Sequence, residues 1–156
     1  MAYNVFISYS AWADQVLALR LQTLAGVYGF TAYVPPAQTR QSTVALLRDD
    51  VRRAINDADL FLAVVTQAPS TAAVAEVEYA RGQNRLIIPI VGPFVDRSFL
   101  QSFPQAFYID PSNPGKVETD ILAFLKQSHT DKTNRNLFVG LSALAVGLLL
   151  LSATSE

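Results

Sequence analysis

The sequence of 156 residues contains no cysteine and a single histidine, His129. Without cysteine the chain has no disulfides, no thiolate nucleophile and no Cys-based zinc site, and one histidine argues against a His-based metal site. The chain also has no excess of charge of one sign, because 12 Lys plus Arg stand against 13 Asp plus Glu. No long basic run is present, so we expect no nucleic acid partner. This balance favours a neutral ligand or none.

The glycine patterns that bind phosphates are also missing. Neither Gly-x-Gly-x-x-Gly nor the P-loop pattern occurs in the sequence. A dinucleotide would therefore need a pocket assembled from several segments, because no single glycine-rich loop can cradle its phosphates. The chain has no internal repeat, and its length fits one domain with a sizeable core.

The first 36 residues have the pattern of a β-α-β unit. An apolar run at 5–10 leads into residues with helical spacing, and a second apolar run at 30–34 ends at two prolines. Asp14 precedes the apolar helix positions and is expected to cap this helix. Two such strands must lie parallel, and runs this apolar indicate a sheet covered on both faces. The unit therefore predicts a doubly wound α/β domain.

The rest of the chain continues the alternation of strands and helices. A helix with one charged and one apolar face is expected at 44–55, and a helix with a Ser cap is expected at Ser70 to Gly82. A closing helix is expected from Pro114 to Gln127. Three further strands are expected at 60–66, 86–91 and 106–110, the last at an edge of the sheet.

Two of these segments resemble a known family. The stretch Phe6-Ile7-Ser8-Tyr9-Ser10, followed by a helix and by residues 29–35, resembles the opening of a TIR domain of bacterial type. The resemblance extends from about Tyr3 to about Gln127. It implies a TIR domain at 1–127 with a flavodoxin-like, five-stranded parallel sheet and helices on both faces. Residues 128–135 are then a linker.

The resemblance also implies a catalytic residue. The stretch from Ser70 to Ala80 resembles the TIR motif that contains the glutamate required to cleave NAD+ between nicotinamide and ribose, and Glu76 has its place. A carboxylate beside the ribose can stabilise the oxocarbenium charge that develops there. NAD+ is then the substrate, with no metal and no prosthetic group. In one departure from the motif, Ala72 stands where an aromatic residue is usual.

Other interpretations of these acids remain open. Glu78 lies about 200° from Glu76 around a helix, so the two cannot face the same pocket. We expect Glu78 on the solvated side, where it can pair with Arg81. Without the resemblance, Glu76 would be interpreted as an acid favoured near a helix N-terminus.

The remaining candidate site residues follow the first two strands. Ser8, Tyr9 and Ser10 end the first strand, where hydroxyl and backbone donors can reach a dinucleotide. Trp12, expected in the loop after that strand, and Arg40, in the loop after the second strand, are expected to contact the same ligand. Strand-end hydrogen bonding is the alternative for the serines, and simple packing is the alternative for Trp12.

The C-terminal segment differs from the rest. Residues 136–155 form a run of 20 residues without a charge. As a helix it would extend about 30 Å, the thickness of a bilayer core. Lys126, Lys132 and Arg135 precede it, so residues 136–156 are expected to anchor the protein in the cell inner membrane with the domain on the cytoplasmic side. The alternative is a helix that packs against another copy.

Together these features predict a membrane-tethered TIR-domain NAD+ glycohydrolase or cyclase. The family implies activation by assembly with other TIR domains, as a homo-oligomer or filament, and a role in bacterial immunity against phage. One alternative is a non-catalytic adaptor that acts through homotypic TIR contacts. Another is an effector whose transmembrane tail perturbs the membrane.

Overall fold

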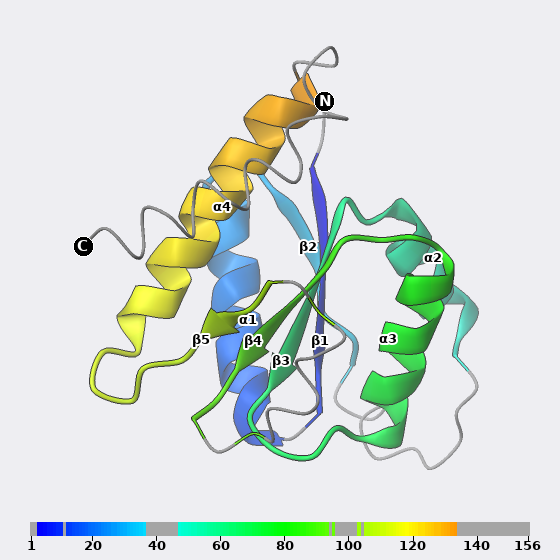
Figure 1. Cartoon of the computed structure of the whole chain (residues 1–156). Coiled ribbons are helices and arrows are strands. Elements are labelled where there is room, and N and C mark those ends of the chain that lie inside the picture. Colours follow the sequence, from blue (N-terminus) through cyan, green and yellow to red (C-terminus); the bar gives the residue numbers. More distant parts are fainter. Residues whose placement is uncertain are drawn as a thin grey trace.

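The computed structural model describes residues 3–10, 12–36, 47–93, 95, 103 and 105–133, which form five strands and four helices (Figure 1). The strands are β1 (Asn4–Tyr9), β2 (Thr31–Tyr33), β3 (Leu60–Val65), β4 (Ile87–Val91) and β5 (Phe107–Tyr108). The helices are α1 (Trp12–Val27), α2 (Asp49–Asp57), α3 (Thr71–Gly82) and α4 (Gly115–Thr133).

All strand pairs in the sheet are parallel, and their order is β2-β1-β3-β4-β5. This is the flavodoxin-like order, so the predicted fold class is confirmed for the sheet. The chain reverses its direction of travel across the sheet between β1 and β3. In open sheets of this kind, ligands bind beyond the carboxyl ends of the strands at that reversal. A ligand-binding site is therefore expected at the carboxyl ends of β1 and β3.

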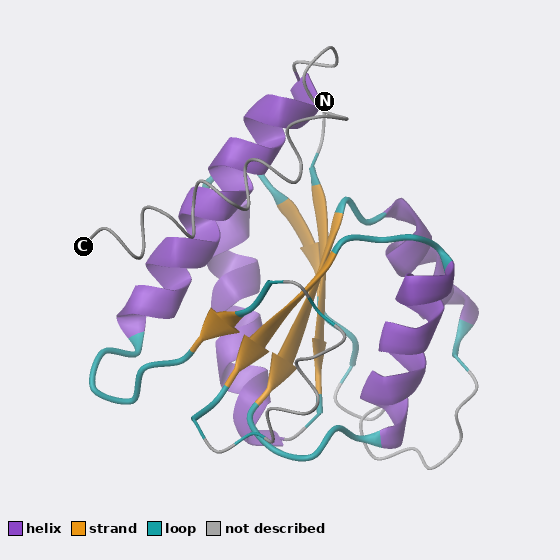
Figure 2. Ribbon diagram, in the orientation of Figure 1, coloured by secondary structure: helices purple, strands orange, loops and turns teal. Residues whose placement is uncertain are grey.

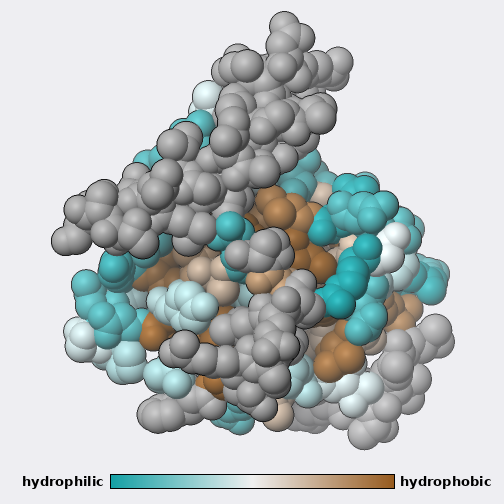
Figure 3. All heavy atoms as spheres, in the orientation of Figure 1, coloured by the Kyte–Doolittle hydropathy of each residue, from teal (hydrophilic) through white to brown (hydrophobic). Residues whose placement is uncertain are grey.

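Helices cover both faces of the sheet, with α1 and α4 on one side and α2 and α3 on the other (Figure 2). The alternation of side chains along β1 divides the core accordingly. Val5, Ile7 and Tyr9 belong to the apolar cluster under α1 and α4, whereas Phe6 belongs to the cluster under α2 and α3. On the face drawn in Figure 3, apolar atoms gather toward the middle and polar atoms surround them.

Three aromatic rings stack across the sheet on the side of α2 and α3. The Phe6 ring lies 5.4 Å from the Tyr33 ring at 20° and 5.0 Å from the Phe61 ring at 15°. These rings come from three adjacent strands, β2, β1 and β3. Stacked rings at such distances add to the burial energy of each ring. The stack fixes the end of β2 beside the middle of β1.

Helix α1 begins earlier than the sequence pattern predicts. It starts at Trp12, so Trp12 belongs to the helix and not to the preceding loop, and Asp14 lies inside the first turn. The predicted N-cap role of Asp14 is therefore wrong. Asp14 is buried, and its carboxylate accepts a hydrogen bond from the hydroxyl of Thr66 after β3. Asp14 thus ties the start of α1 to the end of β3.

Helix α4 continues to Thr133, beyond the expected end at Gln127. The first residues of the expected linker are therefore helical. Ser128 is buried, and the His129 ring packs edge-to-face on Tyr3 at 6.3 Å and on Phe30 at 5.6 Å. The contacts of His129 with Tyr3 and Phe30, the residues just before β1 and β2, stabilise the additional helical residues. The local sequence pattern does not predict these contacts.

Among the residues described, no helix is long and apolar enough to cross a bilayer. The expected transmembrane segment 136–156 lies outside the described residues.

Candidate functional site

The carboxyl ends of β1 and β3 meet the N-terminus of α3, and hydrogen bonds hold this junction together. Ser70 caps α3, as predicted, because its hydroxyl accepts a hydrogen bond of 3.1 Å from the Ala73 backbone N–H. The Ser70 backbone N–H in turn donates to Ser10 Oγ at 3.0 Å. Ser10 therefore connects the end of β1 to the first turn of α3, and the helix N-terminus is held over the sheet.

Glu76 lies on the buried side of α3. Its side chain is 1% exposed, and Ser8 Oγ donates a hydrogen bond of 2.7 Å to Glu76 Oε1. Ser8 has no exposed surface and is the next-to-last residue of β1. A buried carboxyl group needs such a partner, because a buried polar group without one costs about 1–3 kcal/mol. The two residues therefore form a buried polar pair in an apolar layer.

A cavity of about 220 Å³ adjoins this pair. Its walls come from the ends of β1 and β3 and from α3, and they include Ser8, Ser10, Ala63, Ala73, Glu78 and Arg81. Among the described residues, Glu76 is not one of those that line it. The two acids of α3 thus divide as their helical spacing requires, but Glu78 is the one in the cavity wall. Glu78 is exposed, as predicted for the solvated side of the helix, and it also contributes to the wall of this cavity.

A second, more open hollow of about 560 Å³ lies between α2 and α3. Arg52 and Tyr79 contribute to its wall, and it shares Val74 and Glu78 with the first cavity. The two hollows therefore adjoin across α3. Pockets for small molecules commonly measure about 300–1,000 Å³. The inner cavity alone is below this range, whereas the second hollow falls within it.

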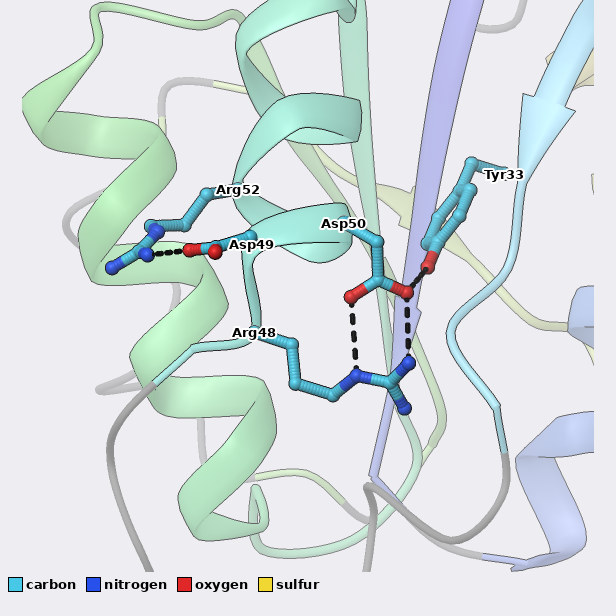
Figure 4. A network of polar contacts seen from close by, with 5 residues as sticks. All are labelled: Tyr33, Arg48, Asp49, Asp50 and Arg52. Atoms are coloured by element: carbon cyan, nitrogen blue, oxygen red, sulfur yellow. Dashed lines mark hydrogen bonds and ion pairs between the residues drawn. The ribbon is translucent and has the colours of Figure 1, made fainter.

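A polar network lies where β2 ends and α2 begins (Figure 4). The Tyr33 hydroxyl donates to Asp50 Oδ2 at 3.3 Å, and Arg48 approaches both carboxylate oxygens of Asp50 at 3.1 Å. Arg52 forms an ion pair with Asp49 in the same turn of α2. A two-point contact between a guanidinium and a carboxylate fixes orientation as well as distance. The network therefore ties the end of β2 to the first turn of α2.

Burial raises the pKa of Tyr33, and the negative charge of Asp50 and its hydrogen bond raise it further. The positive charge of Arg48 lowers this pKa, and the charge of Glu76 raises it. Tyr33 thus stays neutral at physiological pH.

The other candidate residues are placed as follows. Ser8 and Ser10 line the cavity, but Tyr9 does not belong with them. Tyr9 points into the core under α1 and α4, and its hydroxyl donates to the Pro35 carbonyl at 3.1 Å. The Tyr9 side chain therefore lies on the opposite face of the sheet from the cavity, because alternate residues of a strand face opposite sides, and a contact of Tyr9 with the ligand stays a prediction. The side chain of Trp12 and all of Arg40 lie outside the described residues.

In the described part of the chain, no group of three or more His, Cys, Asp or Glu residues is placed to hold a metal ion. The sequence analysis missed Tyr33, Arg48 and Asp50. The alternation along β2 and the helical spacing in α2 place them on facing surfaces, but nothing local shows that they meet.

Comparison with known proteins adds little to this geometry. No model of a protein family matches the chain, and no curated protein matches it. Among solved structures, the chain is similar to the TIR domains of the activated Roq1 resistosome, which directly recognizes the pathogen effector XopQ. The sequence identity is 17%, the TM-score is 0.49, and the match covers 64% of this chain and 62% of the other. The fold assignment therefore rests on the observed strand order.

Proposed function

We propose that this protein is a TIR-type enzyme that cleaves NAD+ between nicotinamide and ribose, by hydrolysis or cyclisation. The observation that carries the proposal is the placement of Glu76. It is buried and hydrogen-bonded to Ser8 at the carboxyl end of β1, where the strand order reverses. The sequence motif assigns the same residue to catalysis. Ligand sites in sheets of this type lie at that reversal.

The chemistry requires stabilisation of positive charge on the ribose. As the bond from C1′ to the nicotinamide nitrogen breaks, its electron pair leaves with nicotinamide, and positive charge develops on the ribose. In hydrolysis, a water oxygen then bonds to C1′ and releases a proton. A fixed negative group in a site shielded from water stabilises this charge more strongly than water does. Glu76 supplies that group in the proposal.

The adjoining hollows suit an elongated substrate. A dinucleotide is larger than the inner cavity of about 220 Å³, but the second hollow of about 560 Å³ continues from it past Val74 and Glu78. Arg81 contributes to the wall of the first and Arg52 to the wall of the second. A guanidinium is well suited to bind phosphate oxygens. These two side chains support an NAD+ molecule that spans both hollows.

Assembly and membrane attachment complete the proposal. We propose that the enzyme is active as an assembly of TIR domains on the cytoplasmic side of the inner membrane, anchored by residues 136–156, and that it acts in immunity against phage. The uncharged run at 136–155 supports the anchor. Anchoring would raise the effective concentration of copies in the membrane and favour their contacts.

The test is NAD+ consumption by the full chain at high concentration in liposomes. The wild type should release nicotinamide, and Glu76→Ala should lower kcat by about 100-fold or more, the effect of losing one charge-stabilising group. Glu78→Ala should raise KM while keeping most of kcat, since Glu78 lines the cavity but lies on the exposed side of α3. If the assembled wild type releases no nicotinamide, the enzymatic proposal is wrong.

An adaptor function is the second candidate, and the surface of α1 favours it. Val16, Leu19 and Val27 are 64%, 43% and 73% exposed, and Tyr28 follows them at 49%. Apolar side chains grouped on a surface often mark a protein interface. An adaptor would keep its cellular phenotype in Glu76→Ala while NAD+ stays constant.

A membrane-perturbing effector would instead lose toxicity when residues 136–156 are replaced by an unrelated anchor.

A further inference from the structure

The outer side of α1 carries apolar side chains that are open to solvent. Val16, Leu19, Val27 and Tyr28 are exposed, and we call these four residues the α1 stripe. Val16 and Val27 are separated by close to three full helical turns, so they lie on one side of α1. Grouped apolar side chains gain free energy when a partner removes them from water. The α1 stripe is therefore a candidate docking surface.

Helix α4 lies beside α1 and runs in the same direction. Arg20 Nε lies 2.8 Å from Glu118 Oε1, and Lys126 Nζ lies 4.2 Å from the centre of the Tyr28 ring. The same number of residues separates Arg20 from Tyr28 as separates Glu118 from Lys126, so the two segments are parallel and in step. Both end near the amino ends of the strands, opposite the candidate site (Figure 1).

The chain beyond α4 has the length needed to return along the α1 stripe. Helix α4 ends at Thr133, about 10 Å past Lys126 along the helix axis, and Lys126 is level with Tyr28. A helix that returns from this end as far as Val16 must span about 28 Å. The uncharged run at 136–155 has 20 residues and spans about 30 Å as a helix. The short connection at 134–135 is typical of antiparallel helix pairs.

We propose that, before membrane insertion, residues 136–155 fold back as a helix and cover the α1 stripe. The run has no charge, so it can pack on apolar side chains without leaving a charge unpaired. Arg20, the charged residue beside the stripe, is already paired with Glu118. Docking removes two apolar surfaces from water at once. This inference rests on the membrane anchor of the proposed function and describes its state outside the bilayer.

Docking and insertion exclude each other, because one helix cannot lie on α1 and span the bilayer at the same time. Insertion therefore uncovers the α1 stripe and leaves it free to contact a second copy. The membrane shifts the balance between the two states because it binds only the released run. Assembly is then favoured at the membrane, where the anchor also concentrates the copies.

Disulfide crosslinking tests the docked state. The chain has no cysteine, so two introduced residues are its only thiols. By helical rise, Ala143 comes opposite Val27 and Leu151 comes opposite Leu19. The full chain is synthesised in a cell-free reaction as Val27→Cys with Ala143→Cys, or as Leu19→Cys with Leu151→Cys. Under mild oxidation both pairs should form an intramolecular disulfide, and liposomes present during synthesis should reduce its yield several-fold.

Swapped pairs are the matched controls. Val27→Cys with Leu151→Cys, and Leu19→Cys with Ala143→Cys, place the thiols about 12 Å apart along the helices, whereas a disulfide needs Cα atoms within about 7 Å. Their disulfide yield should be several-fold lower than that of the matched pairs. Equal yields in all four variants would indicate random collisions and overturn the proposal. A disulfide between two chains would show that a second copy covers the α1 stripe, which also overturns it.

Insertion kinetics give an independent measurement. Leu19→Glu places a charge in the α1 stripe and leaves the run unchanged, so it should weaken docking and speed insertion several-fold, measured as flotation with liposomes after short incubations. Tyr108→Glu is the control, because Tyr108 is exposed on β5 and lies outside the stripe. It should insert at the rate of the wild type. A Leu19→Glu variant that also inserts at this rate would contradict docking.

The two proposals fail in different ways. A full chain that crosslinks as expected but never floats with liposomes refutes the anchor and leaves docking in place. A chain that floats but forms none of the expected disulfides without liposomes refutes docking alone. Neither result depends on nicotinamide release, which tests the enzymatic activity separately.

Discussion

At the scale of single residues, the sheet face under α2 and α3 combines apolar packing with a few satisfied polar groups. Ser8 and Glu76 bond to each other, and Tyr33 bonds to Asp50 while its ring stacks on Phe6. Each pair joins segments that are distant in sequence. Because an unpaired buried polar group is costly, the buried Ser8–Glu76 pair restricts how α3 can be arranged on β1.

The raised pKa of Tyr33 predicts a pH dependence of stability. Because the pKa is raised in the folded state, neutral Tyr33 contributes stability that is fully present below its ordinary pKa of about 10 and is lost as pH rises through the folded value. The wild type should therefore lose unfolding free energy more steeply above about pH 10 than Tyr33→Phe does. Denaturant unfolding at several alkaline pH values measures this.

Asp50→Asn provides the matched control. It keeps an acceptor for the Tyr33 hydroxyl but removes the charge, so it should lower the pKa of Tyr33 toward its ordinary value. An ultraviolet titration of tyrosinate, with Tyr33→Phe subtracted, follows that group alone. Equal alkaline slopes in the wild type and Tyr33→Phe would contradict the prediction.

At the scale of elements, the segments that follow β3 and β4 pack closely together beside the first turn of α1. Thr66 follows β3 and donates its hydroxyl proton to Asp14 in α1. Gly92 follows β4 and packs directly against Thr66. A side chain at Gly92 would meet the Thr66 Cα at 3.1 Å and its Cγ2 at 3.2 Å. Close packing therefore favours glycine here, although the Gly92 backbone has no unusual conformation.

Gly92→Ala should destabilise the fold. The added methyl group would press on the Thr66 backbone, and overpacking of this kind costs about 1–3 kcal/mol. Gly82→Ala is the control, because it lies at the end of α3 with no atom within 4 Å of the added carbon. It should gain about 0.5–1 kcal/mol from helix propensity. Denaturant unfolding measures both, and a Gly92→Ala variant as stable as the wild type would show that Thr66 yields freely.

At the scale of the whole molecule, one sheet with two helical layers places the candidate site at the reversal of strand order. The site takes Ser8 and Ser10 from β1 and the residue after it, and Glu76 and Glu78 from α3. These segments are brought together only when β3 has inserted beside β1 and α3 has packed on the sheet. Site formation therefore depends on completion of the central strands.

The expected membrane anchor gives a prediction for the whole chain. The full chain should float with liposomes in a density gradient, and a chain truncated after Thr133 should not, because the uncharged run lies beyond that residue. Val146 lies near the middle of the run. Val146→Lys should reduce flotation, since a central Lys costs about 2.5–3.5 kcal/mol on the insertion scale. Val146→Leu should float like the wild type. Equal flotation of the Lys variant would favour packing of this segment on protein.

The sequence by itself determined most of the elements and their type. Apolar periodicity predicted the five strands and four helices, and a Ser cap predicted the start of α3. These signals are local, because a strand or helix shows its period, and a cap its residue type, within a few positions. The motif around Glu76 likewise selected a residue that the fold places beside the cavity. The parallel, doubly wound architecture followed from the same patterns.

Only the tertiary structure decided which partners these residues have. Glu76 is buried behind Ser8, with Glu78 in the cavity wall, because the rotation of α3 on the sheet is set by packing. Asp14 bonds to Thr66 and does not cap α1, and α4 extends because His129 meets Tyr3. Ser8 and Glu76 are 68 residues apart. Contacts of this kind form when distant segments pack together, and no local pattern in the sequence specifies them.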